Sequence, residues 1–430
     1  YLNPLATNLL LFVLTRIFTL TQLLRENSKY IQWLLYIAAA LLIFLWLQPL
    51  VATKTPSRIV QSTINGVFLG GIYAVIALGI VVINKASGVF NFAHGAMMMI
   101  SAFAFYSFFT VSDISFIGSL ILATATVLMV VTTGSWSALR NPSVLIGSIV
   151  TIIALTVLMT FRPEGGLSVG NFNFDSMNWV NAIFGATTAT VLIGLLIERF
   201  TIRPLIGQPI FAAVMVTLAL AEILAGVTTL IWGTQPKALT IFGTPNPFTG
   251  GLARINTPIV LDTSALMGFP INIDPPRLYA FIIAMIAFAG FFLFFRYTNI
   301  GLAMRATSED QQLAESVGLR VRVILAVTWA ISAVMAGIAA IMQVGASDSN
   351  ALSTDIQFIA LRAFPAVLLG GLESIGGALV GGIILGLTEE WAKMLFNTDV
   401  AANFAPYVVL MIILVIRPEG LFGEKRIERI

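Results

Sequence analysis

The segment Asn91-Phe92-Ala93-His94-Gly95 has the residue types best suited to contact a polar solute inside a membrane. It holds the only histidine of the 430-residue chain and lies between two long apolar segments. A break in a membrane helix leaves backbone groups unpaired, and a neighbouring amide and imidazole can bind a polar molecule there. The same side chains could instead pair between helices, as buried polar groups normally do. Asn91 and His94 are therefore candidates for a solute path or for helix pairing.

Glu222 is a second candidate for the solute path, because it lies in the middle of the apolar run Phe211 to Trp232. A carboxylate at that depth is costly and usually marks an ion or substrate pathway. A protonated or internally paired carboxyl group is the alternative.

Membrane helices must hold these residues. Apolar residues make up 58% of the chain, charged residues 10%, and the mean hydropathy is +0.95. A soluble protein could not cover that much apolar surface. The apolar runs are continuous and do not alternate, which disfavours a β-barrel. We expect an all-α polytopic bundle of about 11–13 membrane helices. Zero cysteines and one histidine exclude thiolate and multi-histidine metal sites, and the net charge of +3 does not indicate nucleic-acid binding.

Hydropathy predicts the following spans: Ile31–Val51, Ile59–Ile83, Phe90–Phe109, Ile114–Thr132, Ser143–Phe161, Ala182–Phe200, Phe211–Trp232, Leu278–Phe295, Val323–Met342, Ile356–Leu369, Ile375–Trp391 and Ala405–Ile416. A further stretch, Leu5–Leu24, is a candidate span, but Arg16 near its middle suits a helix in the membrane interface at least as well, so it is left out of the count. If the spans alternate strictly, most basic residues, including those of the loop 297–322 and the C-terminal Lys425, Arg426 and Arg429, fall on one side. The positive-inside rule makes that side cytoplasmic.

The loop 297–322 predicts a short helix exposed to water. Thr307, three residues before Asp310, matches a capping box, and Gly318 is placed to end the helix. Such a helix between two spans would suit docking of another protein, although an ordinary solvated connector has the same composition.

Glycines four residues apart predict close helix packing: Gly66 and Gly70, Gly377 and Gly381, Gly382 and Gly386. Gly370-Gly371 forms a pliable turn between two apolar arms. We assign Gly370, Gly371, Gly377 and Gly381 a hinge or packing role, with Gly370-Gly371 either a tight cytoplasmic turn or the tip of a re-entrant pair.

Several motifs in one order resemble the permease subunits of branched-chain amino acid ABC importers. They are Asn91 to Gly95 after an apolar run, the loop Gly301 to Gly318, the stretch Ala363 to Gly386 and the ending Arg417-Pro418-Glu419-Gly420-Leu421-Phe422-Gly423. The resemblance covers roughly residues 64–109 and 182–423, within a permease domain at 59–430. Residues 1–58 form an added membrane or interfacial region, and 111–180 an added helical pair.

This resemblance implies a transport subunit, not an enzyme, in the bacterial inner membrane with a cytoplasmic C-terminus. By similarity, Arg305, Glu309, Asp310, Ala314 and Gly318 belong to the segment that contacts the ATPase. The implied partners are a second permease subunit, two ATP-binding subunits and an external solute-binding protein. No Gly-x-x-x-x-Gly-Lys-Ser/Thr loop occurs in the sequence. We therefore expect ATP and Mg²⁺ to bind the ATPase, and we expect this chain to bind no cofactor.

Three other functions compete with import of a branched-chain or similar small amino acid. A related permease could carry urea or a short amide. A secondary transporter would be expected to show several buried ionisable groups, of which Glu222 is the clearest here. A structural membrane subunit of a larger complex would account for the added segments.

Overall fold

The computed structural model describes residues 48, 51–111, 115–160, 168–169, 172–173, 177–205, 208–245 and 252–423. The chain divides into two compact units, Tyr1–Arg58 and Ile59–Ile430. The predicted interfacial helix Leu5–Leu24 and nearly all of the predicted span Ile31–Val51 lie outside the described residues.

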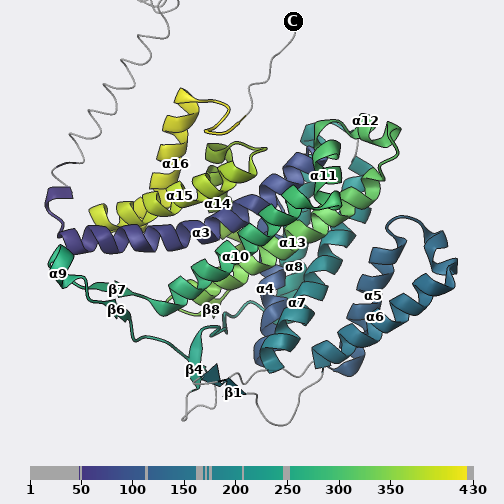
Figure 1. Ribbon diagram of the computed structural model, residues 1–430, viewed down its shortest axis with the longest axis horizontal. Coiled ribbons are helices and arrows are strands. Elements are labelled where there is room, and N and C mark those ends of the chain that lie inside the picture. Colours follow the sequence, from purple (N-terminus) through teal and green to yellow (C-terminus); the bar gives the residue numbers. More distant parts are fainter. Residues whose placement is uncertain are drawn as a thin grey trace, which may run out of the picture. The chain divides into compact units, whose positions relative to one another are not determined.

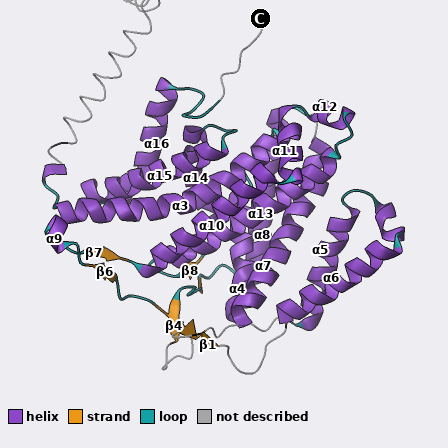
Figure 2. Cartoon of the chain, in the orientation of Figure 1, coloured by secondary structure: helices purple, strands orange, loops and turns teal. Residues whose placement is uncertain are grey.

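Long helices form most of the second unit (Figures 1 and 2). They are α3 (Pro56–Ser87), α4 (His94–Tyr106), α5 (Phe116–Thr132), α6 (Pro142–Thr160), α7 (Met177–Leu196), α8 (Ile210–Trp232), α10 (Pro275–Tyr297), α13 (Val321–Ala346), α14 (Gln357–Gly370), α15 (Ile375–Phe396) and α16 (Asp399–Ile416). Eight helices of the described residues are long and apolar enough to cross a membrane, and α4, α5 and α14 are shorter. The predicted all-α polytopic bundle is confirmed.

Short elements connect these helices. They are α9 (Ser264–Met267), α11 (Asn299–Glu309), α12 (Gln311–Ser316), the π-helical turns η1 (Ser107–Val111) and η3 (Ile197–Ile202), and the 3₁₀ turns η2 (Trp136–Arg140), η4 (Arg203–Leu205) and η5 (Thr354–Ile356). Four antiparallel strand pairs are described: β1 (Ser168–Val169) with β2 (Phe172–Asn173), β3 (Lys237–Ala238) with β8 (Ala351–Leu352), β4 (Gly243–Pro245) with β5 (Leu252–Arg254), and β6 (Ile259–Leu261) with β7 (Ile271–Ile273).

Helix α3 lies at the centre of this unit, whereas α8 lies at its surface. In the most apolar window of each helix, 89% of the residues of α3 are buried but only 11% of those of α8. A helix that is apolar all round and buried all round packs against neighbours on every side, so α3 is the element that brings distant segments together.

Glycines let α3 approach α15 backbone to backbone, as their spacing predicts. A Cβ atom on Gly66 would lie 2.8 Å from Cα of Leu387, and one on Gly70 would lie 2.7 Å from Cα of Ile383. Such separations leave no room for any side chain, so only glycine fits at these two positions. This contact fixes the position of Tyr73 on α3 relative to the last turns of α15.

The turn between α14 and α15 is equally close-packed. A Cβ atom on Gly370 would overlap the backbone of Gly377, and Gly371 has a positive φ of 100°. The C-terminal motif packs on this turn, since the amide of Leu421 donates to the carbonyl of Leu369 at 2.8 Å. Asn84, near the end of α3, donates to the carbonyl of Leu372. The turn therefore lies at the same end of the bundle as the end of α3.

Candidate functional site

The break between α3 and α4 is held by Asn91. Its side chain is buried, and its Oδ1 accepts a hydrogen bond from the backbone amide of Ala93 at 3.0 Å. This is the local turn that asparagine side chains favour over continued helix. Helix α8 supports the same break, because the amide of Phe92 donates to Oγ1 of Thr217 at 3.4 Å. The amide group of Asn91 also donates to Sδ of Met97 on α4 at 3.3 Å, so its hydrogen bonds to described residues stay within the break and the helix that follows it.

His94 begins α4 and is completely buried between α3 and α13. Neither of its ring nitrogens has a hydrogen-bond partner in the described part of the chain. Its ring fills the space above Gly79, where a Cβ atom would lie 2.6 Å from Cε1 of His94. Ser332 on α13 donates to the carbonyl of Gly79 at 2.8 Å and holds the third helix against this pair. An unpaired buried imidazole costs stability, so this group is held by its packing alone.

Glu222 is exposed on α8, on a different face of that helix from the one that packs. Thr217, which contacts the break, is five residues earlier, and five residues turn a helix by about 140°. Glu222 makes no hydrogen bond or ion pair with the described residues. The structure thus brings Asn91 and His94 together and leaves Glu222 facing outward. Their contact with a solute stays a prediction.

The loop between α10 and α13 contains two short helices and not one, which corrects the predicted capping box. Helix α11 begins at Asn299 because Oγ1 of Thr298 accepts the amide of Gly301 at 3.0 Å. Thr307 therefore lies inside α11, where its hydroxyl donates to the carbonyl of Ala303. Asp310 is the real cap, since its Oδ1 accepts the amides of Gln312 and Leu313 at 2.8 and 3.0 Å. Gly318, with a φ of 90°, follows the end of α12 as predicted.

Three of the residues in this loop that resemble the ATPase-contacting segment have structural roles. Arg305 donates to the carbonyl of Phe295 and so ties α11 to the end of α10. Ala314 is buried against Ala86, Val321 and Leu325. Asp310 caps α12 as described above.

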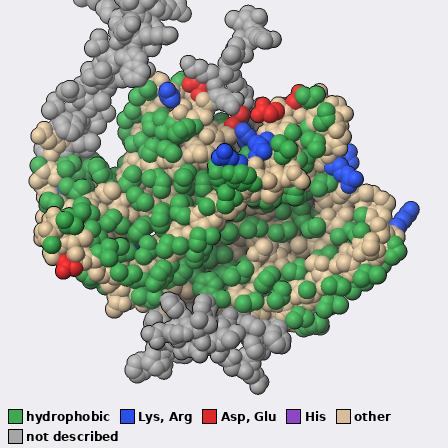
Figure 3. Space-filling model, viewed as in Figure 1, with side chains coloured by type: hydrophobic (Ala, Val, Ile, Leu, Met, Phe, Trp, Pro, Cys, Tyr) green, Lys and Arg blue, Asp and Glu red, His purple; other side chains and the backbone are tan. Residues whose placement is uncertain are grey.

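The outer surface of α11 and α12 combines acidic and apolar side chains. Glu309 is exposed and has no partner among the described residues. Leu302, Leu313 and Val317 in the same loop are also exposed. On the face seen in Figure 3, charged side chains gather mainly along the upper edge, where α11 and α12 lie in Figure 1.

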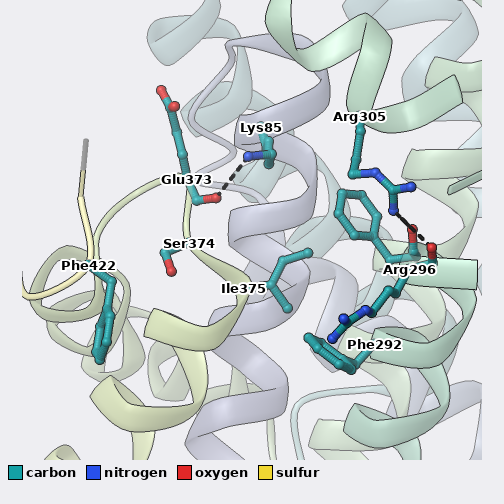
Figure 4. A pocket seen from close by; sticks show the side chains of 9 residues that line it. Lys85, Phe292, Arg296, Arg305, Glu373, Ser374, Ile375 and Phe422 are labelled. Carbon is teal, nitrogen blue, oxygen red and sulfur yellow. Dashed lines mark hydrogen bonds between the residues drawn. The ribbon is translucent and has the colours of Figure 1, made fainter. Parts of the chain in front are cut away.

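A pocket of about 620 Å³ opens beside α11 (Figure 4). It is lined by residues from α3, α10, α11, the α14–α15 turn and the C-terminal motif: Lys85, Phe292, Phe295, Arg296, Arg305, Glu373, Ser374, Ile375 and Phe422. Lys85 donates to the carbonyl of Glu373 at 3.3 Å, which ties the turn to α3. The pocket therefore lies where α11 meets α3, the end of α10, the α14–α15 turn and the C-terminal motif.

The sequence matches a known family over most of this bundle. Residues 144–416 match the family described as "Branched-chain amino acid transport system / permease component". That range is more than half of the chain. The chain belongs to this family. It is therefore a membrane-spanning permease subunit of an ABC importer, and ATP hydrolysis takes place on a separate ATPase chain.

The match to two relatives named for branched-chain amino acid transport covers almost the whole length of those relatives. The high-affinity branched-chain amino acid transport system permease protein LivH of Escherichia coli (strain K12) is 26% identical over 374 residues, covering 86% of this chain and 97% of LivH. The corresponding protein BraD of Pseudomonas aeruginosa is 24% identical over 371 residues, with the same coverage of 86% and 97%. The galactofuranose transporter permease protein YtfT of Escherichia coli is 24% identical over 266 residues, covering 58% of this chain and 73% of YtfT.

A set of polar residues in this permease escaped the sequence analysis. Tyr73 on α3 donates from its hydroxyl to Oε2 of Glu389 on α15 at 2.7 Å. Arg362 on α14 is near enough to attract the Glu389 carboxylate. Arg362 could have been noticed by the rule that selected Glu222, because it also lies within a predicted apolar span. Nothing local in the sequence links it to Tyr73 or Glu389.

Proposed function

We propose that this permease imports a branched-chain or similarly small amino acid across the bacterial inner membrane by alternating access. The observation that carries the proposal is the near full-length similarity to LivH and BraD, whose names state branched-chain amino acid transport. An all-α bundle with a buried polar break at Asn91 and His94 suits passage of a small polar solute.

The ATPase docks on α11 and α12 in this proposal. Leu302, Leu313 and Val317 supply exposed apolar contacts on these helices, and Glu309 supplies an unpaired charge that fixes orientation. Movement of α11 would reach the bundle through Arg305 and the pocket at the end of α3. This side is cytoplasmic, as is the C-terminus. Two ATP-binding subunits, holding ATP and Mg²⁺, then serve two permease chains.

The second permease subunit covers the outer face of α8. Glu222 on this face would otherwise meet lipid, and intramembrane carboxylates almost always face protein or a water-filled cavity. In this proposal Asn91, His94 and Glu222 line or shape the solute path. An external solute-binding protein delivers the amino acid to the opposite end of the bundle.

Uptake into vesicles tests the proposed function. Right-side-out vesicles that hold this permease, its co-purified partners and internal ATP would be given radiolabelled leucine, with urea and galactofuranose in parallel. Inside-out vesicles serve as the control. ATP-dependent leucine uptake is expected. Uptake of urea alone would assign the chain to an amide permease, and uptake of neither amino acid nor amide, with no ATPase in the purified complex, would favour a structural subunit.

A charge reversal at Glu309 tests the docking surface. Glu309→Lys should reduce co-purification of the ATPase about tenfold while leaving the permease folded, because Glu309 is exposed and has no hydrogen bond or ion pair with the described residues. Asp399→Lys is the matched control, because it reverses the charge of an exposed carboxylate outside the loop helices. Unchanged ATPase recovery with Glu309→Lys would exclude this surface.

A further inference from the structure

The hydrogen bond between Tyr73 and Glu389 joins two side chains 316 positions apart in the sequence. Tyr73 is 1% exposed and is enclosed by its neighbours. The Tyr73 hydroxyl donates a hydrogen bond to Oε2 of Glu389. The other carboxylate oxygen, Oε1, accepts no hydrogen bond from the described residues and is not among the fully buried unpaired atoms. The carboxylate is thus oriented by the tyrosine and keeps one oxygen free for another donor.

Arg362 lies on the neighbouring helix at about the same level. Helices α14 and α15 run antiparallel, and a Cβ atom on Gly381 would overlap the carbonyl of Ala366. Arg362 is one turn before Ala366, which brings it level with Leu385, one turn from Glu389. Its long side chain spans that distance, and its charge attracts the Glu389 carboxylate.

The Arg362 guanidinium has no hydrogen bond or ion pair with the described residues. It projects from a helix whose neighbouring residues are apolar, and Phe358, one turn earlier on the same face, is 52% exposed. Among the described residues, the guanidinium of Arg362 thus donates to no anion, and Oε1 of Glu389 accepts from no donor.

A series of charged groups connects this set to the surface of the bundle. Arg277, at the start of α10, donates to Asp348 at 3.1 Å, and the Asp348 side chain is 72% exposed. Glu390 interacts electrostatically with both of these residues and adjoins Glu389 along the chain. Charged side chains therefore extend from the exposed Asp348, at the end of the bundle expected to face outward, to Glu389 beside the buried Tyr73.

We propose that Tyr73, Glu389 and Arg362 form a binding site for the zwitterionic end of a free amino acid. Oε1 of Glu389 accepts a hydrogen bond from the α-ammonium group of the solute, and Tyr73 holds the Glu389 carboxylate in place. Arg362 binds the α-carboxylate of the solute. Phe358 offers an apolar surface to the side chain of the solute. A neutral amide or sugar carries neither charge, so this chemistry selects an amino acid. The inference rests on the proposed function and names the site that would recognise its substrate.

Transport by the full complex with two variants tests this site. Glu389→Gln and Arg362→Gln should each lower ATP-dependent leucine uptake at least tenfold, while ATPase co-purification and basal ATP hydrolysis stay unchanged. The exposed Asp262→Asn and the exposed Arg140→Gln are matched controls and should stay within twofold of the unaltered complex. Arg362 is exposed, so its variant is expected to fold even if a change at Glu389 does not.

Two leucine analogues separate charge recognition from a structural role. Leucinamide lacks the carboxylate and 4-methylpentanoate lacks the ammonium group, so neither should compete with leucine in the unaltered complex. Arg362→Gln should bind leucinamide and leucine equally, whereas Glu389→Gln should lose its preference for leucine over 4-methylpentanoate. Normal leucine uptake in both variants would overturn the site and leave the proposed function standing. A lack of leucine uptake by the unaltered complex would overturn both.

Discussion

Two polar regions lie within this bundle, and they are built in opposite ways. At the α3–α4 break, Asn91 and His94 are close in sequence, fully buried and enclosed by tight glycine packing. At the α14–α15 region, Tyr73, Arg362 and Glu389 come from three helices, and two of them have unpaired polar atoms at the helix surface. The break is closed in this conformation, whereas in the second region Arg362 is exposed and Glu389 is half-buried. A polar motif that is conspicuous in the sequence is thus not the most accessible polar site.

The largest effect should come from filling the closed region. Gly79→Leu would force a side chain into the space of the His94 ring, where even a Cβ atom lies 2.6 Å from Cε1. Overpacking a full interior costs about 1–3 kcal/mol or more, so the purified complex should lose stability by about 3 kcal/mol in detergent unfolding. Gly147→Leu on α6 is the control, because no atom lies within 4 Å of a Cβ there. Equal stability of the two variants would show that the break is loosely packed.

A smaller effect of opposite sign should follow from His94→Leu. Both ring nitrogens lack hydrogen-bond partners among the described residues, and removing a buried unsatisfied polar group stabilises a protein by about 1 kcal/mol. The unfolding midpoint of the complex should rise. A fall of similar size would mean that His94 is paired in the assembled complex, for example by the second permease subunit or a bound solute.

The smallest effect should come from the open region. Tyr73→Phe removes the hydroxyl that donates to Glu389, but this carboxylate can still be solvated at the helix surface. We expect a loss of about 0.5 kcal/mol in unfolding free energy. Leucine uptake should fall more than this stability change explains, because the carboxylate loses its orientation. A stability loss as large as that of Gly79→Leu would show that the two regions are equally closed.

The membrane helices followed from hydropathy, because an apolar run of sufficient length in lipid must satisfy its backbone internally. All the predicted spans after Val51 correspond to described helices. The loop between α10 and α13 was predicted to be helical, but its caps were misassigned. Thr307 and Asp310 both suit an N-cap, and only the hydrogen bond of Thr298 to Gly301 shows that a helix has already begun.

The sequence by itself determined the class of protein, its helices and the break at Asn91, since each depends on composition or on neighbours along the chain. The tertiary structure decided which polar groups are accessible. Glu222 is exposed because α8 packs against the α3–α4 break through the face that carries Thr217, and Glu222 lies on a different face. Tyr73 meets Glu389 only because glycines on α3 and α15 bring two backbones into contact. Such contacts depend on how helices pack in space, and no spacing within one segment encodes them.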